Sequence, residues 1–311
     1  MKIFLYGLTA MCVFHVGLVL VEYYTIQNTG GTIDFQFLNT VHINVEEKKY
    51  DVFNQGFIRP TGVTMDPNYA TGYAGIAFLF CEYIKSQIGK KWYLSFFQVL
   101  VLTIMVLLFS RTGLFSICIT FLISIFFSLR KVNRRPCKVI APEIFVFAII
   151  SIVVSLIVIG FSNEELYEIL IRRLTMKDGS SQMRNNYIVD YFLNADMKEL
   201  LWGTGTSGSG FCLSKLLGMN VGYVWSPEST FITLFIEQGI VFLILFIVFI
   251  TITFLKLMKS TPVFAYIFLY INVMGMAYNF LGDRVYFFLL VIFSMYGFDN
   301  RRIENRPALS E

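Results

Sequence analysis

Four arginines lie in polar segments between long apolar runs, and their side chains are suited to binding phosphate. They are Arg59, Arg111, Arg184 and Arg284. A guanidinium group binds phosphate through two parallel N–H bonds and keeps its charge in poorly hydrated surroundings. One carboxylate, Glu228, stands just before another apolar run, where it also suits the dipole of a following helix. Together these residues predict a site for a substrate with a diphosphate head and a lipid tail.

Smaller polar residues and glycines accompany the arginines. Asp66 and Asn68 follow Arg59, and Gly203 and Gly205 open a glycine-rich run. Glycine allows a backbone to approach a ligand closely, although such a run also suits a flexible loop. The run lacks the Lys and the following Ser or Thr of a nucleotide-binding P-loop. The candidate substrate-binding residues are therefore Arg59, Asp66, Asn68, Gly203, Gly205 and Arg284.

Some of these signals also have purely structural explanations. Asp66 and Pro67 suit the first turn of a helix, because Pro fits its first position and Asp accepts free N–H groups. Arg111 could snorkel to the lipid surface, and Arg284 could pair with Asp283 inside the protein. The functional interpretation therefore depends on the joint placement of the polar clusters, which the surrounding helices must provide.

The composition is typical of a membrane protein with several spans. Of the 311 residues, 56% are hydrophobic and 15% are charged, whereas a soluble domain carries about a quarter charged residues. The 33 Phe and 17 Tyr suit a lipid-facing surface with aromatic belts. The five Cys and two His show no metal-ligand spacing, so we expect no metal, no cofactor and no disulfide.

Eight apolar runs are predicted to cross a bilayer, which takes roughly 17–25 helical residues. They cover residues 3–21, 69–84, 92–109, 113–129, 143–161, 231–255, 263–281 and 285–298, the last being short. The expected fold is an all-α polytopic membrane protein of about eight transmembrane helices, forming a single integral domain over 1–311. The first run is expected to be an uncleaved anchor, because no small-x-small cleavage pattern follows it.

Basic residues gather in alternate loops and predict the orientation of the chain. Cytoplasmic loops are rich in Lys and Arg, and here these residues gather at 85–91, 130–142, 256–262 and the C-terminal tail. Both termini are therefore expected in the cytoplasm. The segments expected outside are 22–68, 110–112, 162–230 and 282–284. All four arginines and Glu228 then fall on the outer face of the membrane.

The largest outer segment, the extracytoplasmic loop at 162–230, is expected to contain short amphipathic helices. Apolar residues recur at helical spacing over 164–176 and again over 186–201. Helices of this kind lie against a membrane surface or cap a helix bundle.

The order of several short motifs in this chain resembles that found in the superfamily of O-antigen ligases and polymerases (Wzy-type). The motifs, in chain order, are Arg59-x-x-Gly62 with Asp66-Pro-Asn68, Ser110-Arg111-x-Gly113, Arg184-x-x-Tyr187 leading to Leu201-Trp-Gly-Thr-Gly205, and Glu228-Ser-Thr-Phe231 with Glu237-x-Gly239. The resemblance covers roughly residues 55–255. Each motif is short, so its specificity lies in order, spacing and topology together. The family usually has ten or more spans, so the chain is expected to be a family member shortened on its N-terminal side.

The resemblance implies a metal-independent glycosyltransferase of the GT-C kind in the plasma (inner) membrane. Its donor would be an undecaprenyl-diphosphate-linked oligosaccharide, used on the outer face to build O-antigen, capsule or exopolysaccharide. In such enzymes arginines hold the diphosphate, a role that the resemblance carries to Arg111, Arg184 and Arg59. A residue before a late span activates the acceptor hydroxyl, which makes Glu228 the candidate base.

The resemblance leaves three functions open. Ligases tend to have a histidine where this chain has Glu228, which favours a polymerase of repeat units. The alternatives are an O-antigen ligase that transfers glycan to an acceptor, and a non-catalytic or transport component of polysaccharide export. The expected partners are the lipid bilayer, the lipid-linked oligosaccharide, and a flippase and a chain-length regulator, with no nucleic acid.

Overall fold

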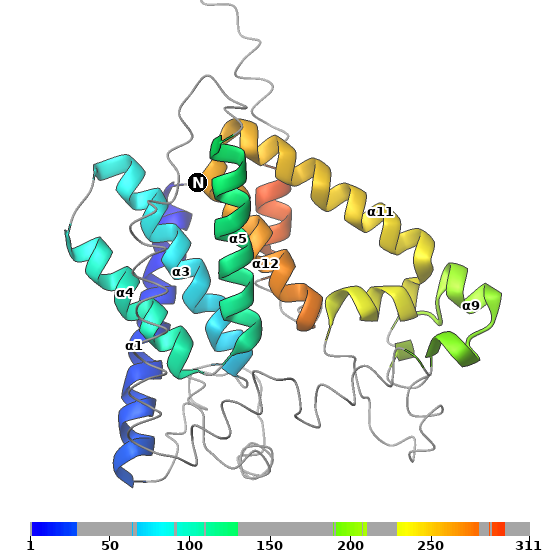
Figure 1. Cartoon of the computed structure of the whole chain (residues 1–311), viewed down its shortest axis with the longest axis horizontal. Helices are drawn as coiled ribbons and strands as arrows, with labels where there is room; N and C mark the ends of the chain where they lie inside the picture. Colours follow the sequence, from blue (N-terminus) through cyan, green and yellow to red (C-terminus); the bar gives the residue numbers. More distant parts are fainter. Residues whose placement is uncertain are drawn as a thin grey trace, which may run out of the picture. The chain divides into compact units, whose positions relative to one another are not determined.

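The structure, a computed structural model, is helical over the part of the chain that it describes (Figure 1). That part comprises residues 2–29, 64, 67–89, 92–108, 110–129, 189, 191–206, 208–209, 229–279, 286 and 288–295. No strand occurs among these residues, so the all-α expectation is confirmed for them. The chain divides into two compact units, Met1–Leu174 and Thr175–Glu311, and each is described by itself.

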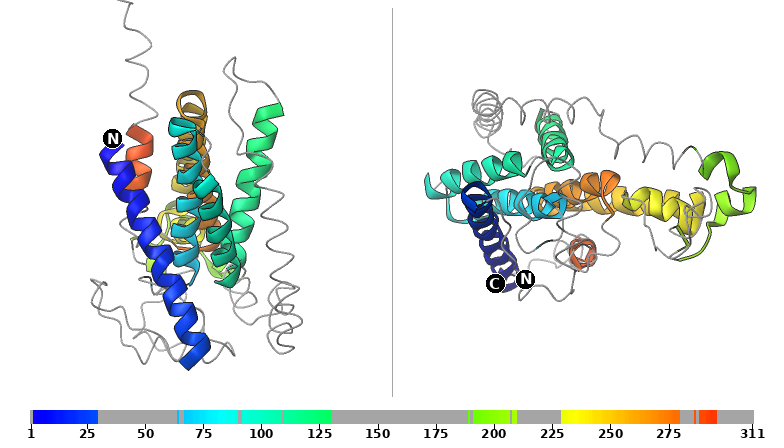
Figure 2. Two further views of the ribbon diagram at one scale, coloured as in Figure 1. Left: turned by 90° about the vertical axis from the view of Figure 1, so that its left-hand side faces the viewer. Right: turned by 90° about the horizontal axis from the view of Figure 1, so that it is seen from below.

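The first unit is built around helix α3 (Pro67–Ile88), which contacts α1 (Lys2–Thr29), α4 (Trp92–Leu107) and α5 (Arg111–Leu129) (Figures 1 and 2). The middle of α3 is fully buried from Ala77 through Phe80. The apolar runs predicted at 3–21, 69–84, 92–109 and 113–129 coincide with these four helices. The run predicted at 143–161 lies outside the described residues.

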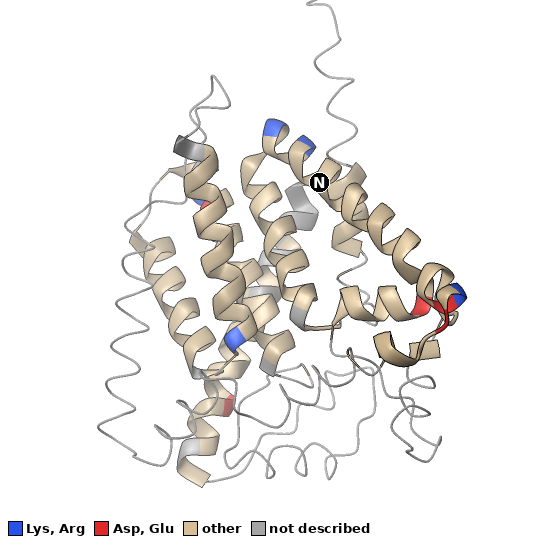
Figure 3. Cartoon of the chain, turned by 45° about the vertical axis from the view of Figure 1, so that its right-hand side comes forward, with Lys and Arg blue, Asp and Glu red and all other residues tan. Residues whose placement is uncertain are grey.

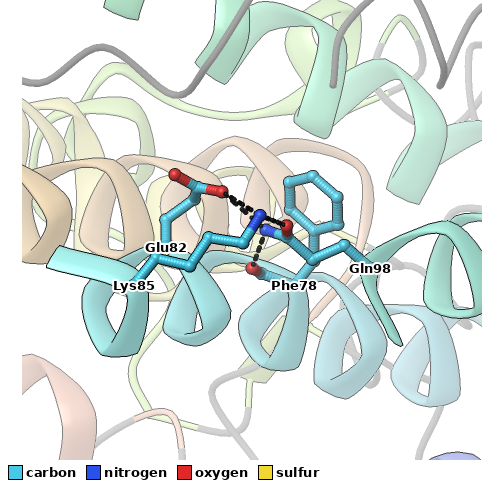
Figure 4. Close-up of polar contacts among 4 residues, drawn as sticks. All are labelled: Phe78, Glu82, Lys85 and Gln98. Atoms are coloured by element: carbon cyan, nitrogen blue, oxygen red, sulfur yellow. Dashed lines mark hydrogen bonds and ion pairs between the residues drawn. The ribbon is translucent and has the colours of Figure 1, made fainter. Parts of the chain in front are cut away.

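A polar network joins α3 to α4 near the end of α3 (Figure 4). Lys85 Nζ donates to Glu82 Oε1 at 3.2 Å and also to Gln98 Oε1. Gln98 Nε2 donates to Glu82 Oε1 at 2.9 Å and to the Phe78 carbonyl at 3.1 Å. The ion pair is largely buried. Lys85 was expected in a loop at 85–91, but it lies within α3, because its charge is satisfied by Glu82 one helical turn before it.

The second unit is organised around α11 (Thr230–Ser260), which contacts α9 (Met197–Trp202) and α12 (Pro262–Ala277). The predicted runs 231–255 and 263–281 fall on α11 and α12, and residues 288–295 of the run 285–298 are helical. The expected basic loop at 256–262 is much shorter than predicted, because α11 continues through Ser260 and α12 begins at Pro262.

Helix α11 is broken at Gly239, whose φ of 78° and ψ of 174° are not helical. The break separates 230–238 from a longer part, 240–260. At 1.5 Å per residue that longer part extends about 31 Å, close to the thickness of a hydrocarbon core. Its side chains include many exposed large hydrophobics, among them Ile244, Leu245 and Val248.

In the described part of the chain, α11 is the one helix long and apolar enough to cross a membrane. Its apolar window has a mean hydropathy of 2.9, yet only 11% of that window is buried within the protein, as expected of a lipid-facing helix. The chain is therefore consistent with an all-α membrane protein.

In the described part of the second unit, charged residues gather near the two ends of the longer part of α11 (Figure 3). Glu237 precedes the break, and Lys198 and Glu199 lie on the neighbouring α9. Lys256 and Lys259 lie near the other end. The apolar stretch between these groups is free of charged residues, which suits a helix that crosses a bilayer.

Candidate functional site

Four of the residues predicted for the site lie in the described part of the chain. Asn68 and Arg111 belong to the first unit, and Gly203 and Gly205 belong to the second. The predicted site residues that lie outside the described residues are Arg59, Asp66, Arg184, Glu228 and Arg284. Convergence of the arginines with Glu228 therefore stays a prediction.

In the first unit, the N-termini of α3 and α5 meet at a hydrogen bond between Ser110 and Asn68. Ser110 Oγ donates to Asn68 Oδ1 at 2.7 Å and accepts from the Gly113 N–H at 3.3 Å. Ser110 thus caps α5 and ties it to α3, although the two residues are 42 positions apart in the sequence. Pro67 is the first residue of α3, as its preference for that position predicted.

Arg111 is the first residue of α5 and is half-buried at this junction. A cation at a helix N-terminus is disfavoured by the helix dipole, so helix stability does not account for this arginine. The free N–H groups of a helix N-terminus attract anions. An arginine beside two such N-termini therefore makes the junction chemically suited to a phosphate group.

Gly113, two residues after Arg111, allows α5 to pack closely against α3. A Cβ atom at Gly113 would lie 1.9 Å from Thr71 Cγ2 and 2.9 Å from Thr71 Cβ. Thr71 and Gly113 are both buried. The glycine of the motif Ser110-Arg111-x-Gly113 thus holds the two N-termini together.

In the second unit, Gly203 and Gly239 pack backbone against backbone. Gly203 ends α9 with φ 79° and ψ 177°, nearly the same conformation as Gly239. A Cβ at Gly203 would lie 2.2 Å from the Glu237 carbonyl oxygen, and one at Gly239 would lie 2.2 Å from the Leu201 carbonyl oxygen. The close approach expected of Gly203 is therefore made to α11. We call residues 203–206, 208–209 and 236–239 together the glycine clasp.

Hydrogen bonds across the glycine clasp satisfy the carbonyl groups that the helix break exposes. In an unbroken helix these carbonyls would accept from N–H groups four residues on. Here the Ile236 carbonyl accepts from the Thr204 N–H at 2.8 Å and from Thr204 Oγ1 at 3.0 Å. The Glu237 carbonyl accepts from the Gly205 N–H at 2.9 Å.

Side chains add two further hydrogen bonds to the glycine clasp. Ser209 Oγ, which is buried, donates to Glu237 Oε1 at 2.6 Å. Gln238 Nε2 donates to Thr206 Oγ1 at 3.1 Å on the exposed side. Gly205 has a φ of 96°, which favours glycine, and a Cβ built on it would have no atom within 4 Å. Its glycine is therefore needed for the backbone conformation of the turn and not for close packing.

The start of α11 is anchored to the end of α12. Ser229 Oγ donates to the Met276 carbonyl at 2.7 Å and accepts from the Ile232 N–H at 3.4 Å, which caps α11. The Tyr278 carbonyl accepts from the Thr230 N–H at 3.2 Å and from Thr230 Oγ1 at 3.0 Å. The segment 230–238 is therefore fixed at both ends, and Glu228 directly precedes the anchored Ser229 in the sequence.

The aromatic residues before α9 pack on the short first part of α11. Tyr191 and Phe235 meet edge to face with ring centroids 5.6 Å apart, and Phe192 stacks on Phe235 at 5.0 Å. The helix predicted over 186–201 is not continuous, because it is interrupted before α9. Asp196 there takes the cap position, and its N–H donates to Glu199 Oε2 at 3.1 Å.

The role of Glu237 was missed by sequence reasoning, although the motif Glu237-x-Gly239 was recognised. A carboxylate within an apolar run was the available signal, because such a group needs a partner. The partner, Ser209, lies 28 positions earlier and belongs to the glycine run. The predicted helix 164–176 of the large loop lies outside the described residues.

Comparison with known proteins gives one match. Residues 96–247 match a family described as O-Antigen ligase. Searches of curated proteins and of solved structures gave no match. The matched stretch includes most of α4, all of α5, the glycine clasp and the first part of α11. The predicted resemblance to the O-antigen ligase and polymerase superfamily is therefore confirmed over residues 96–247.

Proposed function

We propose that the protein polymerises oligosaccharide repeat units carried on undecaprenyl diphosphate, at the outer face of the plasma (inner) membrane. Its family supports a ligase-like or polymerase-like role in polysaccharide biosynthesis. The observation that carries the proposal is the junction at Ser110 and Asn68, where two helix N-termini meet beside Arg111. A junction of this kind suits the diphosphate of a lipid-linked donor.

In this proposal the chain crosses the membrane about eight times, with both termini in the cytoplasm and the loop 162–230 outside. The single membrane domain, of the GT-C kind, uses neither metal nor other cofactor. A reporter fused after residue 140 is expected to report the cytoplasm, and one inserted near residue 180 is expected to report the outside. The opposite pattern would contradict the topology.

The proposed reaction is an inverting displacement at the anomeric carbon of the donor sugar. The acceptor hydroxyl oxygen attacks that carbon, its proton passes to the Glu228 carboxylate, and the bond from the carbon to the diphosphate oxygen breaks. Arg111 and Arg184 stabilise the charge that develops on the departing diphosphate. Arg59, Asp66, Asn68, Arg284, Gly203 and Gly205 are proposed to line or support the substrate site.

The test of this function is chain growth by Glu228→Gln and Arg111→Lys in a deletion strain. General-base catalysis contributes about 10²–10⁴-fold, so Glu228→Gln is expected to leave only single repeat units. Arg111→Lys is expected to fail as well, because a point charge does not reproduce the planar guanidinium fork. Membrane levels equal to wild type are the control. Full-length polymer from Glu228→Gln would contradict the role of the base.

A ligase is the second candidate function, because the matching family is described as O-Antigen ligase. The two functions differ in what a deletion strain accumulates. Loss of a polymerase leaves single-repeat products, whereas loss of a ligase leaves long lipid-linked chains. A non-catalytic or transport role predicts that Glu228→Gln complements fully. A flippase and a chain-length regulator are the proposed protein partners, to be sought by co-purification from membranes.

A further inference from the structure

Glu237 lies two residues before the break of α11 at Gly239, and its carboxylate is hydrogen-bonded to Ser209. Its side chain accepts a hydrogen bond of 2.6 Å from the buried Ser209 hydroxyl. Its backbone carbonyl accepts from Gly205 at 2.9 Å. Glu237 thus binds Ser209 through its side chain and Gly205 through its backbone.

The segment 230–238, which this contact closes, is short and fixed at its other end. Ser229 and Thr230 are bonded to carbonyls at the end of α12. Tyr191 packs on the middle of the segment, in a cluster with Phe235 and Ile236. If the hydrogen bonds of the glycine clasp break, the segment 230–238 keeps its anchor at Ser229. It then loses the contact at its other end that fixes its orientation.

We infer that Glu237 is a positioning residue, whose hydrogen bond with Ser209 keeps the glycine clasp closed and so fixes the segment that follows Glu228. This inference rests on the proposed function. Glu237 does not contact the substrate in this role, and its charge is not required. What it needs is an oxygen that accepts from Ser209.

The test uses the full-length protein in nanodiscs, supplied with an undecaprenyl-diphosphate-linked repeat unit as both donor and acceptor. Glu237→Ala is expected to lower kcat by about 10- to 100-fold, because small misplacements of reacting groups have effects of this size. The KM should stay within about twofold, since the substrate contacts remain. Ser209→Ala should reproduce this loss, and the double variant should be no worse than either single variant.

Two matched variants separate positioning from other roles. Glu237→Gln keeps the accepting oxygen and should retain activity within about threefold of wild type, since only its charge changes. Gln238→Ala removes the neighbouring exposed hydrogen bond to Thr206 and should leave kcat unchanged. A Glu237→Gln variant as inactive as Glu237→Ala would overturn the inference, because the carboxylate charge would then be essential. Full activity in Ser209→Ala would overturn it as well.

Hydrogen exchange provides a readout that does not depend on activity. The amides of Thr204 and Gly205 donate across the glycine clasp, so their peptide should exchange faster in Glu237→Ala and Ser209→Ala and at the wild-type rate in Glu237→Gln. A wild type that does not polymerise would overturn the proposed function and this inference together. An active wild type with unchanged kcat or unchanged exchange in Glu237→Ala would overturn this inference alone.

Discussion

Two contacts in this protein each bring distant segments together at a glycine: the α3–α5 junction and the glycine clasp. The two contacts are made by different kinds of atoms. At the first junction Gly113 faces the side chain of Thr71, and Ser110 bonds to the side chain of Asn68. At the glycine clasp Gly203 and Gly239 each face the other segment's backbone. The first contact is made mainly by side chains, whereas the second is made mainly by the main chain.

This difference determines how each contact responds to mutation. A side chain can be shortened by a second substitution, so a clash with it can be relieved. A backbone carbonyl cannot be removed, so a clash with it remains whatever the neighbouring side chain is. We therefore expect the glycine clasp to be the less tolerant of the two contacts.

Gly239→Ala is expected to give the largest loss of stability. The residue has a backbone conformation that is essentially restricted to glycine, which costs about 1–3 kcal/mol for another residue. The new Cβ would also overlap the Leu201 carbonyl at 2.2 Å, and overpacking adds about 1–3 kcal/mol. Together they predict a loss of about 2–6 kcal/mol, measured as the free energy of unfolding of the purified protein in detergent.

Gly205→Ala is the matched control for this prediction. Gly205 also has a positive φ, but open space surrounds the position of its Cβ. Its substitution should therefore show the backbone strain without the overlap, and the loss should be clearly smaller. Equal losses for the two variants would show that close packing in the glycine clasp contributes nothing.

Gly113→Ala is expected to give a smaller loss, and one that a second substitution relieves. The overlap of 1.9 Å is with a methyl group of Thr71, and the helical position gains about 1 kcal/mol from Ala over Gly. We expect a net loss of about 0–2 kcal/mol, from overpacking of about 1–3 kcal/mol reduced by this gain. The measurement is again the free energy of unfolding.

Thr71→Ser supplies the relief, because it removes the methyl group and keeps the hydroxyl. The double variant Gly113→Ala with Thr71→Ser should recover much of the stability lost by Gly113→Ala. By contrast, Leu201→Ala should not rescue Gly239→Ala, because the overlap there is with the Leu201 carbonyl. Rescue at both contacts, or at neither, would remove the distinction between them.

Ser110→Ala is expected to have a moderate effect, of about 0.5–2 kcal/mol, because it removes the cap of α5 and the bond to Asn68. A double-mutant cycle with Asn68→Ala isolates the bond between the two side chains. Residues in direct contact commonly show coupling of about 0.5–3 kcal/mol. Additive effects would indicate that the hydrogen bond does not link the two helices.

The helices were largely predictable from the sequence, because their signals are local. Long apolar runs marked the helices, and Pro67 marked the first residue of α3. The motif around Ser110 and Arg111 was recognised, but nothing in it indicated that Ser110 bonds to Asn68, which lies 42 positions earlier in the chain.

The glycine clasp was not predictable, because nothing local distinguishes Gly239 from a tolerated glycine in a long apolar helix. The non-helical conformation becomes necessary only when residues 203–205 approach from elsewhere in the chain. The break before α9 was missed for a related reason, since apolar spacing continued across Asp196 while the local capping interaction ended the helix. In both cases hydrogen bonds to the backbone interrupt a helix that the spacing of apolar residues predicts to continue.

Thr206→Ala is expected to have the smallest effect, although it removes a hydrogen bond of the glycine clasp. The bond between Gln238 Nε2 and Thr206 Oγ1 is 3.1 Å long and exposed, so water replaces the lost partner on either side. Exposed substitutions of this kind change stability by about 0.5 kcal/mol or less. In the bond from Ser209 to Glu237, in the same clasp, the Ser209 hydroxyl is buried, and Ser209→Ala should cost more, about 1–3 kcal/mol. The free energies of unfolding of Thr206→Ala and Ser209→Ala, measured side by side, test whether the strength of a side-chain hydrogen bond in the glycine clasp depends on its burial. A larger loss of stability from Thr206→Ala than from Ser209→Ala would contradict that dependence.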